Sequence, residues 1–194
     1  IIMEKPIVYI PAPIYNNIVT LWKRWAKCEW SLIAKVWTYD NKLIIKDFFI
    51  PIQENDATNT EMFDIQGSLI SYIQSKPDMA KEIGELNQWR CWIHSHNTMQ
   101  PFWSWTDHDT KKDLSENIFY DESQDIWRSL SIVIWAWEKF HATIDTVTEW
   151  YRMSNDVDIM KLDIDVKNIN DEEIKSKLGQ VSPKIRWLAN IFKS

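Results

Sequence analysis

One strand-like segment restricts the fold more than any other part of this sequence. Residues 90–96 read Arg-Cys-Trp-Ile-His-Ser-His. Successive side chains of a strand point to opposite faces, so Trp92, His94 and His96 share one face and the residues between them share the other. Because apolar residues fall on both faces, we predict a strand that is buried in the centre of a sheet.

Helical and strand-like patterns are mixed along the rest of the chain. Hydrophobic periodicity predicts helices over residues 13–27, 68–86, 105–117, 170–178 and from 182 onward, and strands over residues 29–37, 43–50, 130–135, 140–147 and 158–166. Residues 53–60 are polar and are predicted to form a loop, and Pro77 is predicted to break the second helix. Together these elements predict an α/β (α+β) protein, with a mixed sheet flanked by helices.

Composition narrows the class of protein. The chain has 194 residues, of which 45% are apolar, so it can form one domain with a sizeable core. The net charge is −6 and no basic run is present, so we expect no nucleic-acid partner. The longest uncharged run, residues 6–22, contains three prolines, so we expect no signal peptide and no membrane span. The two cysteines, Cys28 and Cys91, fit a reducing compartment, and we expect a cytoplasmic protein.

The candidate site lies in and after the predicted central strand. It has the pattern H-x-H-x7-S-x-x-D, formed by His94, His96, Ser104 and Asp107. Two histidines that are two residues apart on a strand can direct their imidazoles at one ion. Zinc prefers imidazole nitrogen and carboxylate oxygen, and three protein ligands with one open position form the catalytic arrangement. We therefore predict that His94, His96 and Asp107 bind one zinc ion per chain.

A hydrolytic zinc site also needs a carboxylate that accepts a proton from water and a donor that stabilises the oxyanion. Glu29 is the candidate for the first role and Ser104 for the second. Taken alone, Ser104-x-x-Asp107 predicts a helix capping box, and H-x-H predicts two hydrogen-bonded strand histidines. The complete pattern favours a metal site, and Asp107 can both cap a helix and bind a metal.

These residues resemble the motif of the JAMM, or MPN-plus, zinc metallopeptidases, particularly the prokaryotic and phage-type JAB-domain proteins. The resemblance implies zinc ligation by His94, His96 and Asp107. It also implies acid/base catalysis by Glu29, within Glu-Trp-Ser, and stabilisation of the intermediate by Ser104. The implied fold is a single domain with a curved mixed β-sheet flanked by helices, a sandwich similar to cytidine deaminase. Members of the family hydrolyse peptide or isopeptide bonds, often at the tail of a ubiquitin-like protein.

The resemblance also implies a domain organisation and a kind of partner. Residues 1–150 are expected to form the JAB/MPN-like metallopeptidase domain, and residues 151–194 a strand and helices packed on the same domain. The expected partner is a protein or peptide substrate, with ubiquitin-like proteins as one candidate class. Three alternatives stay open: a non-catalytic MPN-type scaffold, a phage tail-associated peptidase, and a DNA-associated protein similar to RadC. The acidic charge argues against the last, and the complete motif argues against the scaffold.

The numbers of tryptophans and glycines are unusual. The chain has 13 Trp and 3 Gly, whereas glycine makes up about 7% of an average protein. Trp105 follows Ser104, and Trp137 lies in a predicted hairpin turn, two positions where glycine is expected. Either the organism reads UGA as glycine, or a tryptophan-rich surface serves peptide recognition. The codons for Trp105 and Trp137 distinguish the two, because UGG at these positions excludes the first explanation.

Overall fold

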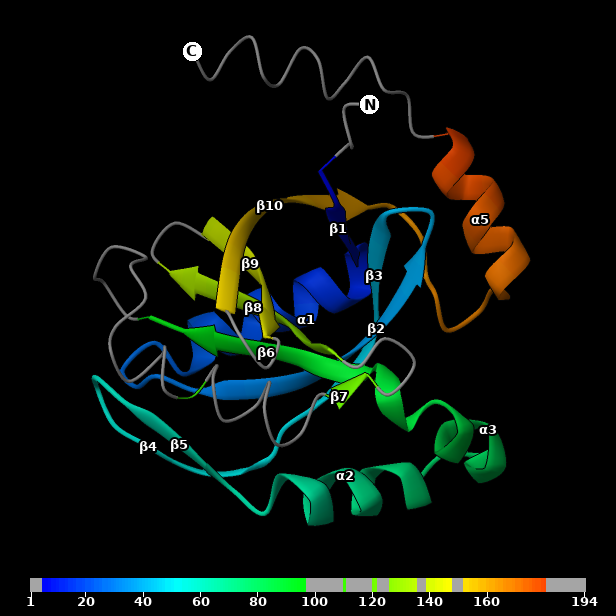
Figure 1. The fold of residues 1–194 in the computed structure, drawn as a ribbon. Coiled ribbons are helices and arrows are strands. Elements are labelled where there is room, and N and C mark those ends of the chain that lie inside the picture. The colour runs from blue at the N-terminus through cyan, green and yellow to red at the C-terminus, as the bar shows by residue number, and fades with distance from the viewer. Residues whose placement is uncertain are drawn as a thin grey trace, which may run out of the picture.

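Seven strands close into a barrel in the computed structural model, which describes residues 5–96, 110, 120–121, 126–135, 139–147 and 152–180. Around the ring the strand order is β6-β2-β3-β1-β10-β9-β8, and β8 returns to pair with β6 (Figure 1). The strands of the ring are β1 (Ile7–Pro11), β2 (Ser31–Tyr39), β3 (Lys42–Phe49), β6 (Trp89–Ser95), β8 (Ile126–Trp135), β9 (Lys139–Val147) and β10 (Arg152–Leu162). The short β7 (Tyr120–Asp121) adds to β8 outside the ring.

The closed ring corrects the predicted fold. The expected curved sheet flanked by helices, a JAB/MPN-like or cytidine-deaminase-like sandwich, is wrong, because the parallel β6–β8 pairing joins the two ends of the sheet. A second parallel pairing, β1 with β10, brings Ile7 opposite Asp158. These contacts join distant parts of the chain, so no local pattern could predict them. β1 itself was not predicted, because prolines interrupt the pattern around it.

The β2–β3 hairpin confirms a local prediction. The two strands pair antiparallel and are joined at Asp40 and Asn41. Both residues have positive φ, 43° and 60°. Aspartate and asparagine tolerate this conformation, and it gives the turn the twist that a two-residue hairpin requires. A bulge between Lys35 and Val36 then shifts the register of the pair.

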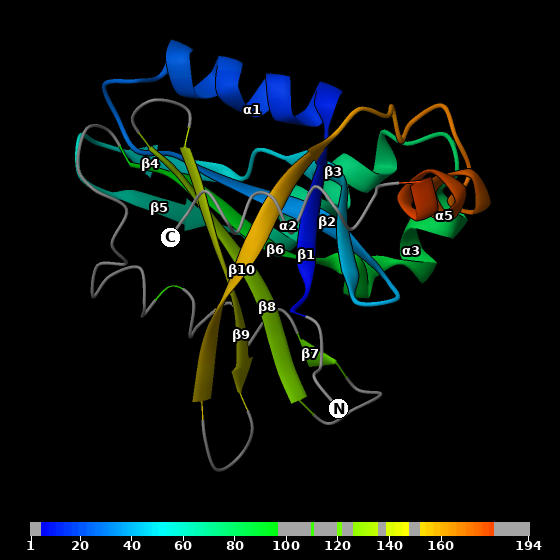
Figure 2. The ribbon, with the colours of Figure 1, turned by 90° about the horizontal axis from the view of Figure 1, so that it is seen from above.

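Two helices cover the barrel at different places. α1 (Ala12–Arg24) lies across one end of the barrel (Figures 1 and 2) and buries Ile14 and Ile18. α5 (Asp171–Gln180) lies outside and is capped by Asn170, whose Oδ1 accepts a hydrogen bond from the Glu173 amide at 2.9 Å. The predicted cap at Asn170 is therefore confirmed, although the helix continues one residue past Gly179.

No helix in the described ranges is long and apolar enough to cross a membrane.

A further layer lies outside β2 and β6. It contains the β4–β5 hairpin, two helices and a 3-10 turn: β4 (Ile52–Asn55), β5 (Thr60–Phe63), α2 (Ile65–Gln74), α3 (Met79–Gly84) and η1 (Leu86–Gln88). The predicted loop over residues 53–60 is confirmed for residues 56–59, which form the turn of the hairpin, and is wrong for residues 53–55 and 60, which lie in its strands. The predicted break at Pro77 is confirmed, because Pro77 lies between α2 and α3.

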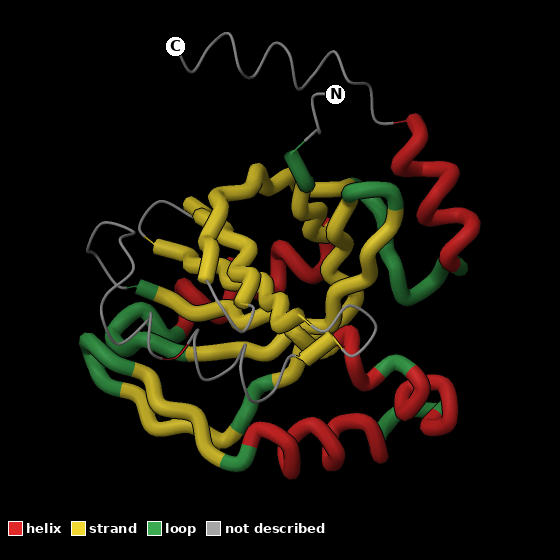
Figure 3. The backbone as a smooth tube through the Cα atoms, in the orientation of Figure 1, coloured by secondary structure: helices red, strands yellow, loops and turns green. Residues whose placement is uncertain are grey.

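The sheet separates two apolar cores. The larger core contains the inward residues of the strands and the buried face of α1, including Val8, Ile18 and Ile93. A smaller core lies between the sheet and α2, where Ile33, Phe49, Trp89 and Trp92 pack with Met62, Ile65, Leu69 and Tyr72. Figure 3 shows the helices outside the ring of strands on this side. The residues around β6 are therefore buried on both faces, as predicted for a central strand.

The described tryptophans occupy ordinary backbone conformations. In the described ranges, the non-glycine residues with positive φ are Asp40, Asn41 and Asp64, so no described tryptophan has the left-handed conformation that favours glycine. Trp30 and Trp92 are at most 2% exposed and fill the two cores. Trp105 and Trp137, the predicted helix at 105–117 apart from Thr110, and the helix predicted from 182 lie outside the described residues.

Candidate metal centre

The antiparallel pairing of β2 with β6 brings the residues that flank Glu29 and His96 together. Trp30 donates its backbone N–H to Ser95 Oγ at 2.9 Å, and Ser95 donates its backbone N–H to the Trp30 carbonyl at 3.0 Å. The β2–β6 register ends with Ser31 opposite His94, and Glu29 and His96 lie just beyond it. Glu29 precedes Trp30 in the chain and His96 follows Ser95, so these hydrogen bonds bring the backbone of the predicted acid/base near the second histidine. The role of the Glu29 side chain stays a prediction.

The two histidines converge on one point. His94 Nε2 and His96 Nε2 are 3.0 Å apart, and their ring planes are inclined by 63°. Two nitrogens bound to one zinc at about 2.0–2.1 Å with tetrahedral geometry lie about 3.3 Å apart, close to the observed separation. His94 is 0% exposed and His96 is 7% exposed. The separation is that of a hydrogen bond between the two rings, and it also fits two imidazole ligands of one ion.

The backbone of His96 is held on two sides after β6 ends. Its N–H donates to the carbonyl oxygen of Ile134 in β8 at 2.8 Å. Its carbonyl oxygen accepts a long hydrogen bond of 3.4 Å from the indole of Trp22, near the end of α1. These contacts fix the second histidine although it lies outside the strand.

The His94 ring packs against the indole of Trp92. The indole of Trp92 stacks on it with ring centroids 4.1 Å apart and planes inclined by 10°. Trp92 Nε1–H donates to Ser31 Oγ at 3.0 Å, and that hydroxyl also bonds to the hydroxyl of Thr60 at 3.1 Å. The sequence analysis did not predict this chain of contacts, although alternation along β6 already places Trp92 and His94 on one face.

The β4–β5 hairpin anchors the start of β2. Gln53 Oε1 accepts from the Ser31 backbone N–H at 2.8 Å, and Gln53 Nε2 donates to the Ser31 carbonyl at 2.9 Å. The Glu29 N–H donates to the Asp56 carbonyl at 2.8 Å. The hairpin turn is itself ordered by a hydrogen bond from the Thr58 backbone, which lowers the pKa of the Asp56 carboxyl. The backbone on both sides of Trp30 is therefore held by the hairpin.

Two of the five predicted site residues lie outside the described part of the chain. They are Ser104 and Asp107, so the donor for the oxyanion and the third ligand stay predictions. Among the residues that the structure describes, no group of three or more His, Cys, Asp or Glu side chains is placed to hold a metal. Cys91 adjoins the histidine pair in sequence but points into the barrel core, where burial raises the pKa of its thiol well above the usual value.

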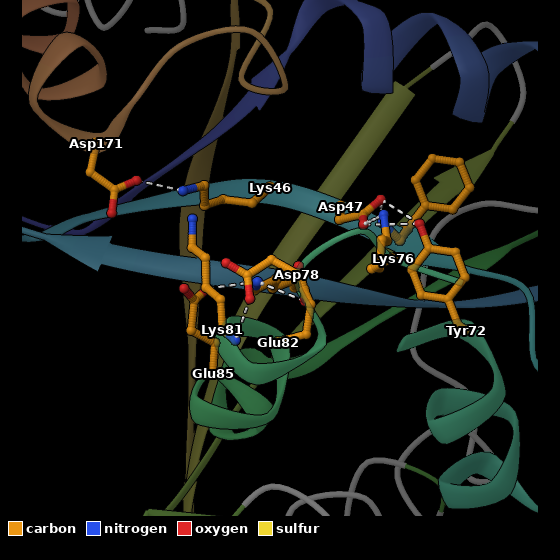
Figure 4. Close-up of polar contacts among 11 residues, drawn as sticks. Lys46, Asp47, Tyr72, Lys76, Asp78, Lys81, Glu82, Glu85 and Asp171 are labelled. Atoms are coloured by element: carbon orange, nitrogen blue, oxygen red, sulfur yellow. Dashed lines mark hydrogen bonds and ion pairs between the residues drawn. The ribbon is translucent and has the colours of Figure 1, made fainter. Parts of the chain in front are cut away.

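A second polar cluster, outside β3, has a structural role. The Tyr72 hydroxyl lies 2.9 Å from each carboxylate oxygen of Asp47, and Lys76 Nζ lies 2.6 Å from one of them (Figure 4). Burial raises the pKa of Tyr72, so its hydroxyl stays protonated and acts as a donor. Burial alone would lower the pKa of Lys76, but hydrogen bonds with Asp47 and Tyr72 raise it overall. The cluster pins α2 to the barrel and contains no group activated for catalysis.

Comparison with known proteins identifies no relative. No protein-family model matches the chain, and no curated protein matches it. Its function is therefore inferred from the geometry of the centre and from the motif.

Proposed function

We propose that this protein is a zinc-dependent hydrolase of peptide or isopeptide bonds, with a site of the JAMM type. The observation that carries the proposal is the convergence of His94 Nε2 and His96 Nε2, which lie 3.0 Å apart at the end of β6. The motif H-x-H-x7-S-x-x-D supports it. The proposal rests on the site alone, since the closed barrel differs from the fold that the family resemblance implied.

Each motif residue has a defined role in the proposal. His94 and His96 supply two neutral nitrogen ligands, and Asp107 supplies a carboxylate. Zinc, when bound there, acts as a Lewis acid and lowers the pKa of water to about 7. Glu29 accepts the proton of the attacking water and returns it to the leaving amine. Ser104 donates a hydrogen bond to the oxyanion, a contact worth about 3–4 kcal/mol in other hydrolases.

The proposed substrate is a protein or peptide, with the tail of a ubiquitin-like protein as the class that the motif suggests. Both histidines are buried, and an imidazole binds metal in its neutral form. The free thiols of Cys28 and Cys91 are compatible with a cytoplasmic enzyme. A non-catalytic scaffold of the same type would not require Glu29, so turnover of a Glu29 variant separates the two functions.

Zinc content and turnover of Glu29→Gln test the proposal. The wild-type chain, expressed with sufficient metal, should contain one zinc ion by elemental analysis and should cleave linear or isopeptide-linked ubiquitin dimers. Glu29→Gln should keep the zinc and lose at least about 100-fold in turnover, because only the proton acceptor is removed. Glu54→Gln, an exposed carboxylate on the nearby hairpin, is the matched control and should keep full activity.

Two results would contradict the proposal. A wild-type chain that contains no zinc after metal-replete expression removes the metal centre. A Glu29→Gln variant that turns over as fast as Glu54→Gln removes the role of Glu29. His94→Ala and His96→Ala should each abolish stoichiometric zinc, which links the metal to this pair of residues.

A further inference from the structure

We propose that Trp92 is a positioning residue of the metal centre, and that Ser31 and the β4–β5 hairpin hold it in place. The inference rests on the proposed function, since it concerns how one of the proposed ligands is oriented. Trp92 has no atom that would touch metal or substrate in this role. It acts through the ring of His94.

The stacking geometry limits the orientation of His94. Its imidazole lies nearly parallel to the Trp92 indole, with centroids 4.1 Å apart and an angle of 10° between the planes. The His96 ring lies against His94 at an angle of 63°. Rotation of the His94 ring about its χ2 bond would drive its edge into the indole. The ring can therefore keep Nε2 directed at His96 without reorganising when a metal binds.

Trp92 is in turn held by a buried hydrogen bond. Its Nε1–H donates to Ser31 Oγ at 3.0 Å, and Ser31 is 0% exposed. Ser31 lies opposite His94 in the β2–β6 pairing, so the acceptor sits on the same face as the ligand. The Ser31 hydroxyl also contacts the Thr60 hydroxyl at 3.1 Å. A buried indole N–H without this acceptor would be left unpaired, so the bond fixes the tilt of the ring.

A second tryptophan on the same strand shows that packing alone does not require such an acceptor. Trp89 is 2% exposed and packs edge-on against Phe49 and Tyr72, with centroid distances of 5.4 and 5.7 Å. Within the described residues its Nε1 has no hydrogen-bond partner. Of these two buried indoles, the one that touches a proposed ligand is also the one that is hydrogen-bonded.

The stacked and hydrogen-bonded Trp92 should make a measurable contribution to metal affinity. In known metal sites, removal of a group that orients a ligand weakens metal binding by about 10-fold to 100-fold. Trp92→Phe keeps an aromatic ring beside His94 but removes the N–H donor, so the stack loses its fixed tilt. Ser31→Ala removes the acceptor and leaves the indole intact. Both variants should therefore weaken metal binding, and both should alter the ligand field.

The experiment compares the full-length wild type, Trp92→Phe, Ser31→Ala and the matched control Trp89→Phe. Affinity for Zn²⁺ is measured by competition with a chelating dye, and the visible absorption spectrum is recorded for the Co²⁺-loaded chains. Trp92→Phe and Ser31→Ala should bind Zn²⁺ about 10-fold to 100-fold more weakly and should shift the Co²⁺ bands. Trp89→Phe should leave both unchanged, although it too removes a buried indole.

The possible failures can be told apart. A wild-type chain that binds neither ion overturns the proposed function and the positioning role together. A wild type that binds both ions, with unchanged affinity and spectrum in Trp92→Phe and Ser31→Ala, overturns the positioning role alone. An equal loss in Trp89→Phe also overturns it, because the effect would then come from general loosening of the outer core. If Trp92→Phe does not fold, Ser31→Ala tests the positioning role of Trp92 by itself.

Discussion

Strand β6 has two faces that are equally buried but differ in what they bury. On the inner face Cys91 and Ile93 are 0% exposed and pack in the barrel core. On the outer face Trp92 and His94 are 2% and 0% exposed, yet this face carries nitrogen atoms that accept or donate hydrogen bonds. Burial therefore does not distinguish core from candidate site. The candidate site is distinguished from the core by buried polar side chains that form hydrogen bonds inside the molecule.

The neighbouring strands repeat this difference. Beside the inner face, Leu32 of β2 and Ile132 of β8 are apolar and fully buried. Beside the outer face, Ser131 of β8 lies opposite Trp92, and Thr143 of β9 lies opposite Ser131. Both of these polar residues are at most 2% exposed. The outer face thus forms a buried polar strip across three strands, and the histidines belong to it.

The largest effect should come from the inner face. Ile93→Ala should lower the free energy of unfolding by about 2–5 kcal/mol, because it removes core contacts and leaves a cavity. Urea denaturation measures this change. The zinc affinity of the folded variant should stay at the wild-type value, since His94 points to the other side of the sheet. A loss of affinity as large as that of Trp92→Phe would show that the two faces are not independent.

The thiol of Cys91 tests whether water is excluded from the inner face. Burial raises its pKa in the folded state above the usual 9.0, so the unfolded chain loses this proton first. The contribution of Cys91 to stability should be constant below pH 9 and should fall above it by up to about 1.4 kcal/mol per pH unit. It is measured as the difference in unfolding free energy between the wild type and Cys91→Ala, because Tyr72 and Lys76 also titrate at high pH. Iodoacetamide should modify half-buried Cys28 in the native protein and Cys91 only after unfolding. Equal native rates for both thiols would mean that the inner face is open to water.

The smallest effect should come from the hairpin that supports the outer face. Thr60→Val keeps the shape of the side chain and removes its hydroxyl, which contacts Ser31 Oγ at 3.1 Å and the Asn55 side chain at 2.7 Å. Stability should fall by about 0.5–1.5 kcal/mol, the usual net value of such hydrogen bonds. Thermal unfolding of Thr60→Val and of the exposed strand control Thr38→Val measures the difference. A loss as large as that of Ile93→Ala would place the hairpin in the core of the fold.

Local features of this protein could be predicted from the sequence, because each depends on nearby residues. Alternation over residues 90–96 predicted the central strand and its two histidines on one face. The Asp40-Asn41 pair predicted a hairpin, and Pro77 predicted a break. The β4–β5 hairpin could not be predicted, because Gln53 and Thr60 hold it through hydrogen bonds and not through an apolar pattern.

The closure of the barrel could not be predicted for a different reason. It depends on three parallel pairings, β6 with β8, β1 with β10 and β1 with β3, and none of them leaves a mark in the local sequence. In the site, the motif suggested Glu29 and the histidines, and the hydrogen bonds between Trp30 and Ser95 bring the backbone next to Glu29 near the second histidine. The link from His94 through Trp92 to Ser31 was missed, since a tryptophan between apolar residues was expected only to fill the core.

The closing pair of strands also sets the order in which the centre can mature during synthesis. All five motif residues have been synthesised once translation reaches Asp107, but β8 begins only at Ile126. Until then β6 has β2 on one side and an open edge on the other, and the His96 N–H lacks the Ile134 carbonyl that accepts it at 2.8 Å in the finished protein. A nascent chain that already contains every motif residue therefore still lacks the strand that holds His94 and His96 on their second side.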